Sequence, residues 1–380
     1  MAPKYKPFIS IEPGEFIKEE LEIRDWRQED LARILGITPK HLNQIITSKK
    51  PITIQTAKLL SKAFGQSPQY WLNLHTNYQL SLGEETQAEA QAEKKAQIYE
   101  HMPIPEMVEK DWIAKWDKNK VDKLVSSVCQ FWCMDQLDFS FMDKWTLPAF
   151  RKSDAFLKYN KYYAMTWHRM AEKCADLYKV PDFDKRQLRK LVANLYKYTS
   201  SENLVPRFLH DLNNVGVKFF VLPHLQNTYT DGAAFSHSGN PVVVWTARYN
   251  RIDNFWFTTA HELAHVVLHL DGRRQNELFI DSVEGSEGEK EEQANAFAEN
   301  VIKANEIIMF FRKNNTHPSK RHVIKCSEEL CISSAIVIGV LHHIGILPQT
   351  HLNQFIGKVV DYIPEHYFAE KQRGKAKLSA

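Results

Sequence analysis

The sequence contains little cysteine: five residues in a chain of 380. Only Cys129/Cys133 and Cys326/Cys331 lie close together, and neither pair is matched by a second pair as in a four-cysteine zinc site. We therefore expect reduced, mostly buried thiols, and neither a disulfide framework nor a cysteine metal site. This cysteine usage is typical of a cytoplasmic protein.

Long apolar runs are also missing. No stretch approaches the ~20 apolar residues that cross a bilayer, and residues 1–6 lead into no apolar core of signal-peptide length. We therefore expect no membrane partner. The net charge of +3 is small, so nucleic-acid binding would need a local basic patch. The length favours two or three domains.

Acidic residues are absent from one long segment. Between Leu31 and Gly83 the sequence has no Asp or Glu. The basic residues of the same segment are Arg33, Lys40, Lys49, Lys50, Lys58 and Lys62. This local positive charge is expected of a nucleic-acid-binding surface, and a helical bundle with a solvated basic face is the alternative.

Residues 25–46 have the pattern of a helix-turn-helix. Ala32 is small where the two helices would cross, and Gly36 can adopt the left-handed conformation that ends the first helix. Thr38 is a suitable N-cap and Pro39 a suitable first residue for the second helix. Two further helices are expected over Ile54–Phe64 and Pro68–Gln79, the first stopped by Gly65 and the second capped by Ser67.

The second helix of this pattern is predicted to read DNA. Asn and Gln can pair with adenine in the major groove, and Lys can reach guanine or phosphate. We expect a homodimer on double-stranded operator DNA with two-fold symmetry. The residues predicted to contact DNA are Gln28, Thr38, Lys40, His41, Asn43, Gln44, Lys49 and Lys50.

The segment after the helix-turn-helix offers few signs of chemistry. Residues 84–100 are rich in Glu, Gln, Ala and Lys, which predicts an exposed spacer helix or a flexible charged linker. Apolar spacing predicts helices throughout 103–205. The tryptophans of this region are expected in the core, with a ligand pocket or partner surface as the alternative; they are Trp112, Trp116, Trp132, Trp145 and Trp167.

A metal-binding pattern lies further along the chain, in the run from Phe255 to His265. On a helix, His261 and His265 lie one turn apart on the same face, so both imidazoles can reach one metal ion. Glu262 is rotated away from them and can hold and deprotonate a water molecule at the site. The alternative is a buried helix that carries two histidines by chance.

A catalytic zinc site needs a third protein ligand. We predict Glu291, because it begins a second helix whose apolar face includes Ala294, and we keep Glu292 as the alternative. Asn295 lies one turn after Glu291, where it could orient a ligand histidine. His269 could do the same for His265, although a packed or solvent-facing histidine is the more ordinary expectation.

Three strands are predicted before the histidine helix: Val217–Leu222, Gly232–His237 and Pro241–Ala247. The turn at 238–240 predicts a hairpin between the last two. A strand beside a zinc helix can bind an extended polypeptide by backbone pairing, which is how we expect a protein substrate to bind. Candidates for stabilising the oxyanion are Tyr229, His237 and Arg251.

Two resemblances follow from these motifs. The segments Ile11–Glu15, 25–46 and Ser67–Leu74 together resemble the HigA/VapI-type antitoxins, a branch of the XRE-like DNA-binding proteins, over roughly the first eighty residues. That resemblance implies a dimer that represses its own operon and neutralises a toxin.

The second resemblance is to the ImmA/IrrE family of zinc metallopeptidases. It is carried by Asp231–Ala234, by Phe257–His269 and by Glu291–Ala298. It implies that His261, His265 and the acid of the last motif bind Zn²⁺, with Glu262 as the base, and that a protein regulator is cleaved or controlled. Ala264 stands where Gly is usual in the family, and Gln293 where Glu is frequent.

The resulting interpretation is a multidomain regulator: an all-α helix-turn-helix domain, an α-helical middle region and an α+β zincin-like metallopeptidase domain. The expected substrate is a protein regulator, a toxin partner or the chain itself. An antitoxin-like repressor with a non-catalytic structural or sensing zinc module is the alternative, and an inactive scaffold a third. The expected divisions are 1–83, a linker at 84–102, 103–205, 206–370, and a basic disordered tail at 371–380.

Overall fold

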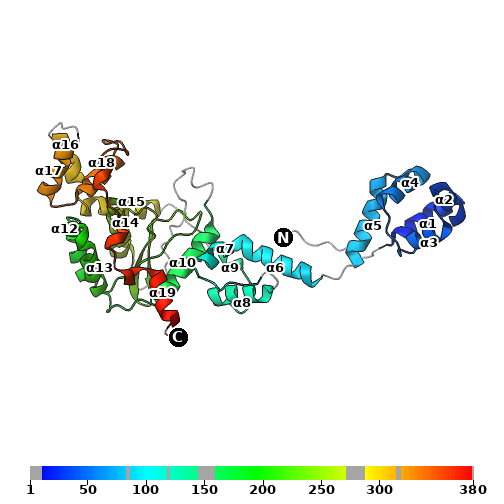
Figure 1. Cartoon of the computed structure of the whole chain (residues 1–380), viewed down its shortest axis with the longest axis horizontal. Helices are drawn as coiled ribbons and strands as arrows, with labels where there is room; N and C mark the ends of the chain where they lie inside the picture. The colour runs from blue at the N-terminus through cyan, green and yellow to red at the C-terminus, as the bar shows by residue number, and fades with distance from the viewer. Residues whose placement is uncertain are drawn as a thin grey trace. The chain divides into compact units, whose positions relative to one another are not determined.

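The computed structural model describes residues 11–82, 86–117, 120–143, 159–270, 287–313 and 318–378 (Figure 1). Trp145 and the first two residues of the expected linker, 84 and 85, lie outside them. The chain forms two compact units, Met1–Glu93 and Lys94–Ala380.

The N-terminal unit is a bundle of five helices. Its core contains Leu31, Ala32, Leu42 and Trp71, which are buried apolar side chains from three of the helices. The helices are α1 (Pro13–Ile23), α2 (Gln28–Leu35), α3 (Pro39–Ile46), α4 (Ile54–Phe64) and α5 (Pro68–Leu82).

The turns of this bundle form as the sequence predicts. Gly36 ends α2 with a φ of 66°, and the Thr38 hydroxyl accepts a hydrogen bond from the His41 N–H at 3.2 Å. Gly65 ends α4 with a φ of 92°. Ser67 accepts a hydrogen bond from the Tyr70 N–H at 3.2 Å at the start of α5.

Helix α6 (Gln87–His101) is helical as expected, but it is not exposed along its whole length. Ile98 and His101 are buried. The His101 ring stacks on Phe139, with 4.6 Å between the centroids, and contacts Tyr162. The end of the predicted spacer therefore belongs to the core of the C-terminal unit.

The middle region is helical, as predicted. It contains α7 (Ile104–Glu109), α8 (Val121–Trp132), α9 (Ser140–Asp143), α10 (Lys161–Ala175), α11 (Lys185–Ala193) and α12 (Leu195–Tyr198). The expected division at 205/206 does not separate two cores, however. Residues of α7, α8 and α10 share one apolar cluster with the strands, and Leu188, Val192 and Leu195 share another. The middle helices therefore pack on the sheet instead of forming a domain of their own.

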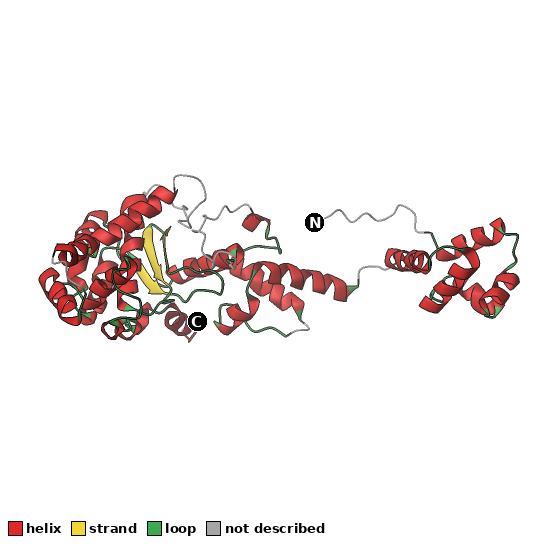
Figure 2. Ribbon diagram, turned by 90° about the horizontal axis from the view of Figure 1, so that it is seen from above, coloured by secondary structure: helices red, strands yellow, loops and turns green. Residues whose placement is uncertain are grey.

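In the described part of the chain the sheet has three strands in the order β1-β3-β2. Figure 2 shows the sheet in yellow among the helices of the C-terminal unit. Strand β1 (Lys218–Val221) is parallel to β3 (Asn240–Trp245), and β2 (Gly232–His237) is antiparallel to β3. Ser238 and Gly239 form the predicted tight turn with φ values of 53° and 85°. The register leaves β2 at the edge of the sheet.

Both faces of the sheet are covered. Phe219 and Val243 point into the cluster that contains α13 (Val205–Asn214) and α14 (Ile252–Ala264), whereas Phe220 and Val242 point into the cluster of the middle helices. This alternation follows from the two-residue period of a strand. The sheet thus holds α14 on one face and α10 on the other.

Among the described residues, the remaining helical segments of five or more residues all follow α14. They are the π-helical turn η3 (His265–His269), α15 (Glu287–Val301), α16 (Ala304–Lys313), α17 (Lys320–Leu330), α18 (Ser334–His343) and α19 (Ala369–Leu378). Among the described residues no helix has both the length and the apolar character needed to cross a membrane.

The expectation of a disordered tail from residue 371 is wrong for the part that the structure describes. Helix α19 extends to Leu378. Ala369 is buried, and the Arg373 guanidinium donates hydrogen bonds to the carbonyl oxygens of Lys110 and Asp111. The basic composition concealed these contacts with the middle region.

Candidate metal centre

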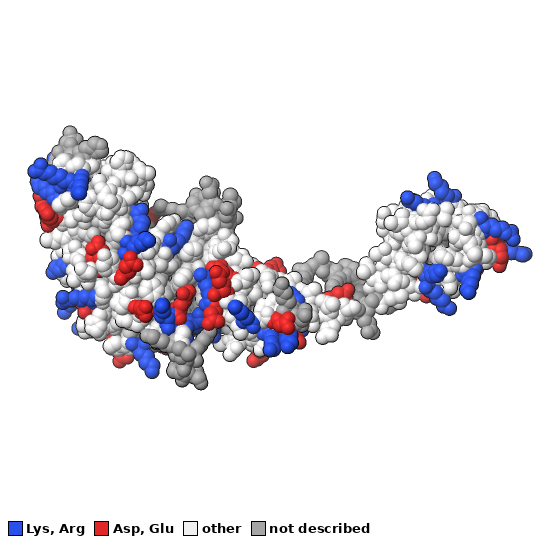
Figure 3. All heavy atoms as spheres, in the orientation of Figure 1, with Lys and Arg blue, Asp and Glu red and all other residues white. Residues whose placement is uncertain are grey.

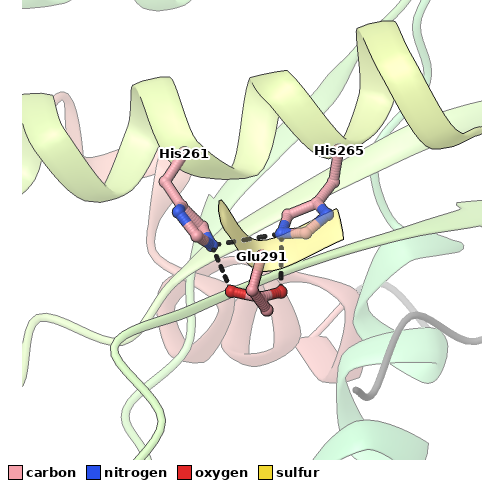
Figure 4. A group of neighbouring side chains, drawn as sticks. All are labelled: His261, His265 and Glu291. Atoms are coloured by element: carbon pink, nitrogen blue, oxygen red, sulfur yellow. Dashed lines mark hydrogen bonds and ion pairs between the residues drawn. The ribbon is translucent and has the colours of Figure 1, made fainter. Parts of the chain in front are cut away.

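Three side chains converge between α14, η3 and α15 (Figure 4). The Nε2 atoms of His261 and His265 lie 3.1 Å apart. One carboxylate oxygen of Glu291 lies 3.2 Å from His261 Nε2, and the other lies 3.1 Å from His265 Nε2. All the potential ligand atoms lie within 4.8 Å of one another, which suits one small cation.

The packing of the two helices explains this convergence. The apolar side chains of α14 around the histidines and the small residues Ala294 and Ala298 of α15 are buried. This close packing directs Glu291 toward the histidines and leaves Glu292 exposed and outside the cluster. The structure therefore places the preferred acid, and not its alternative, beside the histidines.

Hydrogen bonds set which histidine nitrogen faces the site. His261 Nδ1 lies 3.0 Å from the side-chain oxygen of Asn295. Asn295 therefore lies where it can orient this imidazole, which is the position that the sequence predicts for it. The Asn295 oxygen accepts a hydrogen bond, so neutral His261 carries its proton on Nδ1 and presents a lone pair at Nε2. That lone pair faces the Glu291 carboxylate, another acceptor. A cation between the His261 lone pair and the Glu291 carboxylate would interact favourably with both. The side chains present therefore fit a zinc ion.

His265 has its own partners on its far side. His265 Nδ1 lies 3.1 Å from His269 Nδ1, and His269 Nε2 lies 3.1 Å from the side-chain oxygen of Gln293. The π-helical turn, closed by the Leu270 N–H to the His265 carbonyl at 3.0 Å, places His269 within reach. His269 thus contacts the candidate ligand His265 and Gln293, in contrast to the packed or solvent-facing position that is the more ordinary expectation.

Glu262 lies beside the three ligand candidates in a dry environment. Only 8 % of its surface is exposed, and burial raises the pKa of its carboxyl group. The nearby His261 and His265 act in the opposite direction, and Glu291 raises the pKa further. A raised pKa makes a carboxylate a better proton acceptor, which suits a general base.

Gly232 allows β2 to approach Glu262 closely. A Cβ atom at this position would lie 2.9 Å from the Glu262 Oε1 atom and 2.8 Å from a Thr258 methyl group. A larger residue would therefore displace Glu262 or the strand. This is a physical reason for glycine at the first position of β2.

The candidate metal centre opens into a cleft of about 400 Å³. Beside α14 and α15, its walls include Gly232 and Ala233 of β2 and Ala164 and Trp167 of α10. The sequence interpretation found no chemistry in the middle region. Trp167 had no motif to reveal its position, because only the packing of α10 on the sheet brings it to the cleft.

The three oxyanion candidates lie in different places. Tyr229 lines the cleft. His237 lies at the far end of β2, where its Nε2 is 2.6 Å from Asp176. Arg251 pairs with Asp253 and lines a neighbouring cavity instead. Only Tyr229 is in position to face a substrate at this site.

The predicted DNA-contacting residues lie on α3, next to its two ends, and at the start of α2. Lys40 and Asn43 are exposed on α3, and His41 and Gln44 are half-buried there. Thr38 precedes α3, Lys49 and Lys50 follow it, and half-buried Gln28 begins α2. Blue Lys and Arg side chains are spread over the visible face of this unit in Figure 3, and red acidic ones are few.

Two protein-family models match separate parts of the chain. The helix-turn-helix model matches residues 17–71, and the IrrE N-terminal-like domain model, of the M78 peptidases, matches residues 213–331. The second range contains His261, His265 and Glu291.

Curated relatives resemble the N-terminal unit. Virulence-associated protein I of Dichelobacter nodosus is 36% identical over 77 residues, which cover 20% of this chain and 71% of that protein. The uncharacterized HTH-type transcriptional regulator YddM of Escherichia coli is 35% identical over 74 residues, 20% of this chain and 79% of that protein.

Solved structures match the same part of the chain. A HigA-family addiction module antidote protein from Coxiella burnetii is 36% identical, with 19% of this chain and 80% of that chain covered and a TM-score of 0.19. Antitoxin HigA of Pseudomonas aeruginosa, solved with the higBA promoter, is 31% identical, with coverages of 23% and 90% and a TM-score of 0.19. The chain thus belongs to the helix-turn-helix family through its N-terminal unit, and its C-terminal unit carries an IrrE N-terminal-like domain of the M78 type.

Proposed function

We propose that this protein is a DNA-binding transcriptional regulator that carries a zinc-dependent endopeptidase. The observation that carries the enzymatic part is the position of Glu262 next to His261, His265 and Glu291 at the base of a cleft. A purely structural zinc site would be closed by four protein ligands, whereas this group of three opens on a cleft.

His261, His265 and Glu291 would hold the zinc ion, with Asn295 and His269 orienting the two imidazoles. When bound, zinc would act as a Lewis acid that polarises a peptide carbonyl and makes water more acidic. The Glu262 carboxylate accepts a proton from the attacking water and later returns it to the leaving amine. Tyr229 lies in the cleft, where it is a candidate to donate a hydrogen bond to the oxyanion.

The substrate is proposed to be an extended polypeptide that pairs with β2. Among the described residues β2 pairs only with β3, so its other edge has free backbone groups. The residues at the start of β2, Gly232 and Ala233, line the metal cleft. A polypeptide added to this edge would therefore reach the metal centre.

The N-terminal unit is proposed to bind double-stranded operator DNA as a homodimer in the cytoplasm, and to repress its own gene in the manner of an antitoxin. The exposed polar surface of α3 supports this, as does the similarity of this unit to the HTH-type transcriptional regulator YddM. The peptidase substrate would then be a protein regulator, a toxin partner or the chain itself.

The test compares zinc-loaded wild type with zinc-loaded Glu262→Gln. Each is incubated with bacterial cell extract, and new protein N-termini are identified by mass spectrometry. The proposal expects termini that appear with wild type and are reduced by at least about 100-fold with Glu262→Gln. Equal cleavage by both would contradict the role of Glu262. No cleavage by either would favour a repressor with a non-catalytic zinc module.

A further inference from the structure

A second cavity adjoins the metal cleft. It has a volume of about 580 Å³ and lies between α14, α15, α16 and α18. Asn254 and Phe257 line both the cavity and the cleft. The Phe257 ring centroid lies 6.4 Å from that of His261 and 6.5 Å from that of His343, which lines the cavity. Asn254 and Phe257 thus form a wall that the two spaces share.

Much of the cavity wall is aliphatic. Ile302, which follows α15, Ile308 of α16, and Ile336 and Val340 of α18 line it together with Phe257. Such walls favour an occupant with an apolar body.

The charged side chains that line the cavity do not all balance one another. The Arg251 guanidinium is engaged by Asp253, through contacts of 3.0 and 2.7 Å, so these two charges balance. The half-buried Glu299 carboxylate has no hydrogen-bond or ion-pair partner in the described part of the chain. The uncompensated charge is therefore negative, which favours a cationic occupant.

We infer that this cavity binds the side chain of an arginine or lysine of the polypeptide substrate. Its aliphatic stem packs on Ile302, Ile308 and Val340, and its charged head donates hydrogen bonds to the Glu299 carboxylate. Phe257 precedes His261 by about one helical turn and lines both spaces, so the basic residue lies close to the scissile bond in the sequence of the substrate. This inference rests on the proposed peptidase function, whose substrate class it narrows.

The test measures peptide binding without turnover. The zinc-loaded full chain carrying Glu262→Gln is titrated calorimetrically with acetyl-Ala-Ala-Arg-Ala-Ala-amide and with the same peptide containing citrulline, which is neutral and nearly isosteric. We expect the arginine peptide to bind about tenfold more tightly. Adding Glu299→Gln should remove this preference, whereas Glu306→Gln, at an exposed site of α16 outside the cavity, should retain it.

Three results would overturn the inference: no measurable binding of the arginine peptide, equal binding of the two peptides, or a preference that survives Glu299→Gln. The comparison of the two peptides needs no cavity variant, so a misfolded Glu299→Gln protein would not obscure it. Because no cleavage is measured, the binding preference and the peptidase activity can fail independently. Cleavage that depends on Glu262 without any preference for basic residues would contradict this inference alone.

Discussion

The two units of the chain contain helix pairs joined by the same kind of turn. In the N-terminal unit, Gly36 ends α2 in the left-handed conformation, and the Ile37 N–H donates to the Ala32 carbonyl at 3.0 Å. In the C-terminal unit, Cys331 ends α17 with a φ of 54°, and the Ile332 N–H donates to the Ser327 carbonyl at 3.1 Å. An N-cap hydroxyl then begins α3 in one pair and α18 in the other.

The second helices nevertheless have opposite surroundings. Helix α3 presents Lys40 and Asn43 to solvent, whereas α18 buries seven of its ten residues, including Ile336, Val337 and Ile338. One helix exposes hydrogen-bonding side chains to solvent, and the other forms a wall of the cavity beside the candidate metal centre. The turn therefore specifies how two helices meet, and the exposed side chains specify what the pair can bind.

The largest expected difference between α18 and α3 is the loss of unfolding free energy when a charge is introduced on each helix. Val337→Asp introduces a carboxylate at a position with 0 % exposure, which should cost about 4 kcal/mol or more and unfold the C-terminal unit. Asn43→Asp on exposed α3 should leave the free energy of unfolding within about 0.5 kcal/mol of wild type. Urea denaturation followed by circular dichroism compares the two. A stable Val337→Asp protein would mean that α18 is not buried as described.

The next effect concerns operator binding. Replacing Lys40, Asn43 and Gln44 together with Ala should weaken binding to the gene's own promoter by at least about 100-fold, because each base contact is worth ~1–3 kcal/mol. The matched control replaces the exposed Lys320, Arg321 and Lys325 of α17 and should bind as wild type does. Fluorescence anisotropy measures both. Equal losses would show that positive charge, and not the surface of α3, accounts for binding.

A buried histidine, His168, makes the stability of the C-terminal unit depend on pH, whereas an exposed histidine would not. His168 is 2 % exposed, and burial lowers its pKa to about 3, with Arg169 and His237 adding to the effect. Between this value and about 6.5 the unfolded chain binds the extra proton, so stability falls as the pH falls through this range. The contribution is up to about 1.4 kcal/mol per pH unit.

His168→Leu should therefore flatten the loss of stability between about pH 6.5 and pH 4.5. His210→Leu, at an exposed position of α13, should leave the slope unchanged. Urea denaturation of the C-terminal unit at several pH values measures the slopes. The same slope for wild type and His168→Leu would mean that His168 takes up its proton in the folded protein.

The smallest effects concern the turns themselves. Gly36→Ala should destabilise the N-terminal unit by about 1 kcal/mol, because alanine is strained at a φ of 66° although no atom crowds it. Cys331→Gly should be neutral or stabilise the C-terminal unit by up to about 1 kcal/mol, since glycine relieves the same strain. Differential scanning calorimetry resolves both shifts. Destabilisation by Cys331→Gly would mean that its side chain contributes more than the strain costs.

The sequence was sufficient for features that depend on local chemistry. Gly36, Thr38 and Pro39 define a helix end and a helix start, so α2 and α3 could be predicted closely. The spacing of His261 and His265 placed both side chains on one face. Glu291 was preferred to Glu292 because it precedes Ala294 and Asn295 by three and four residues, on neighbouring parts of one helix face.

Features that depend on tertiary packing could not be predicted. The π-helical turn that brings His269 beneath His265 has no recognised sequence signal, and Trp167 reaches the cleft only because α10 covers the sheet. The boundary expected after Val205 ignored the same packing. The helix at the C-terminus was missed because its basic composition resembles that of a solvated tail, whereas Arg373 binds backbone carbonyls far away in the sequence.

The most direct test of the account is the zinc content of the purified full-length protein, measured by elemental analysis beside Glu291→Ala and Glu292→Ala. The account predicts about one zinc ion per chain in wild type and in Glu292→Ala, and loss of zinc in Glu291→Ala. Wild-type protein that stays free of zinc when purified without chelator and supplied with the metal would contradict the proposed centre.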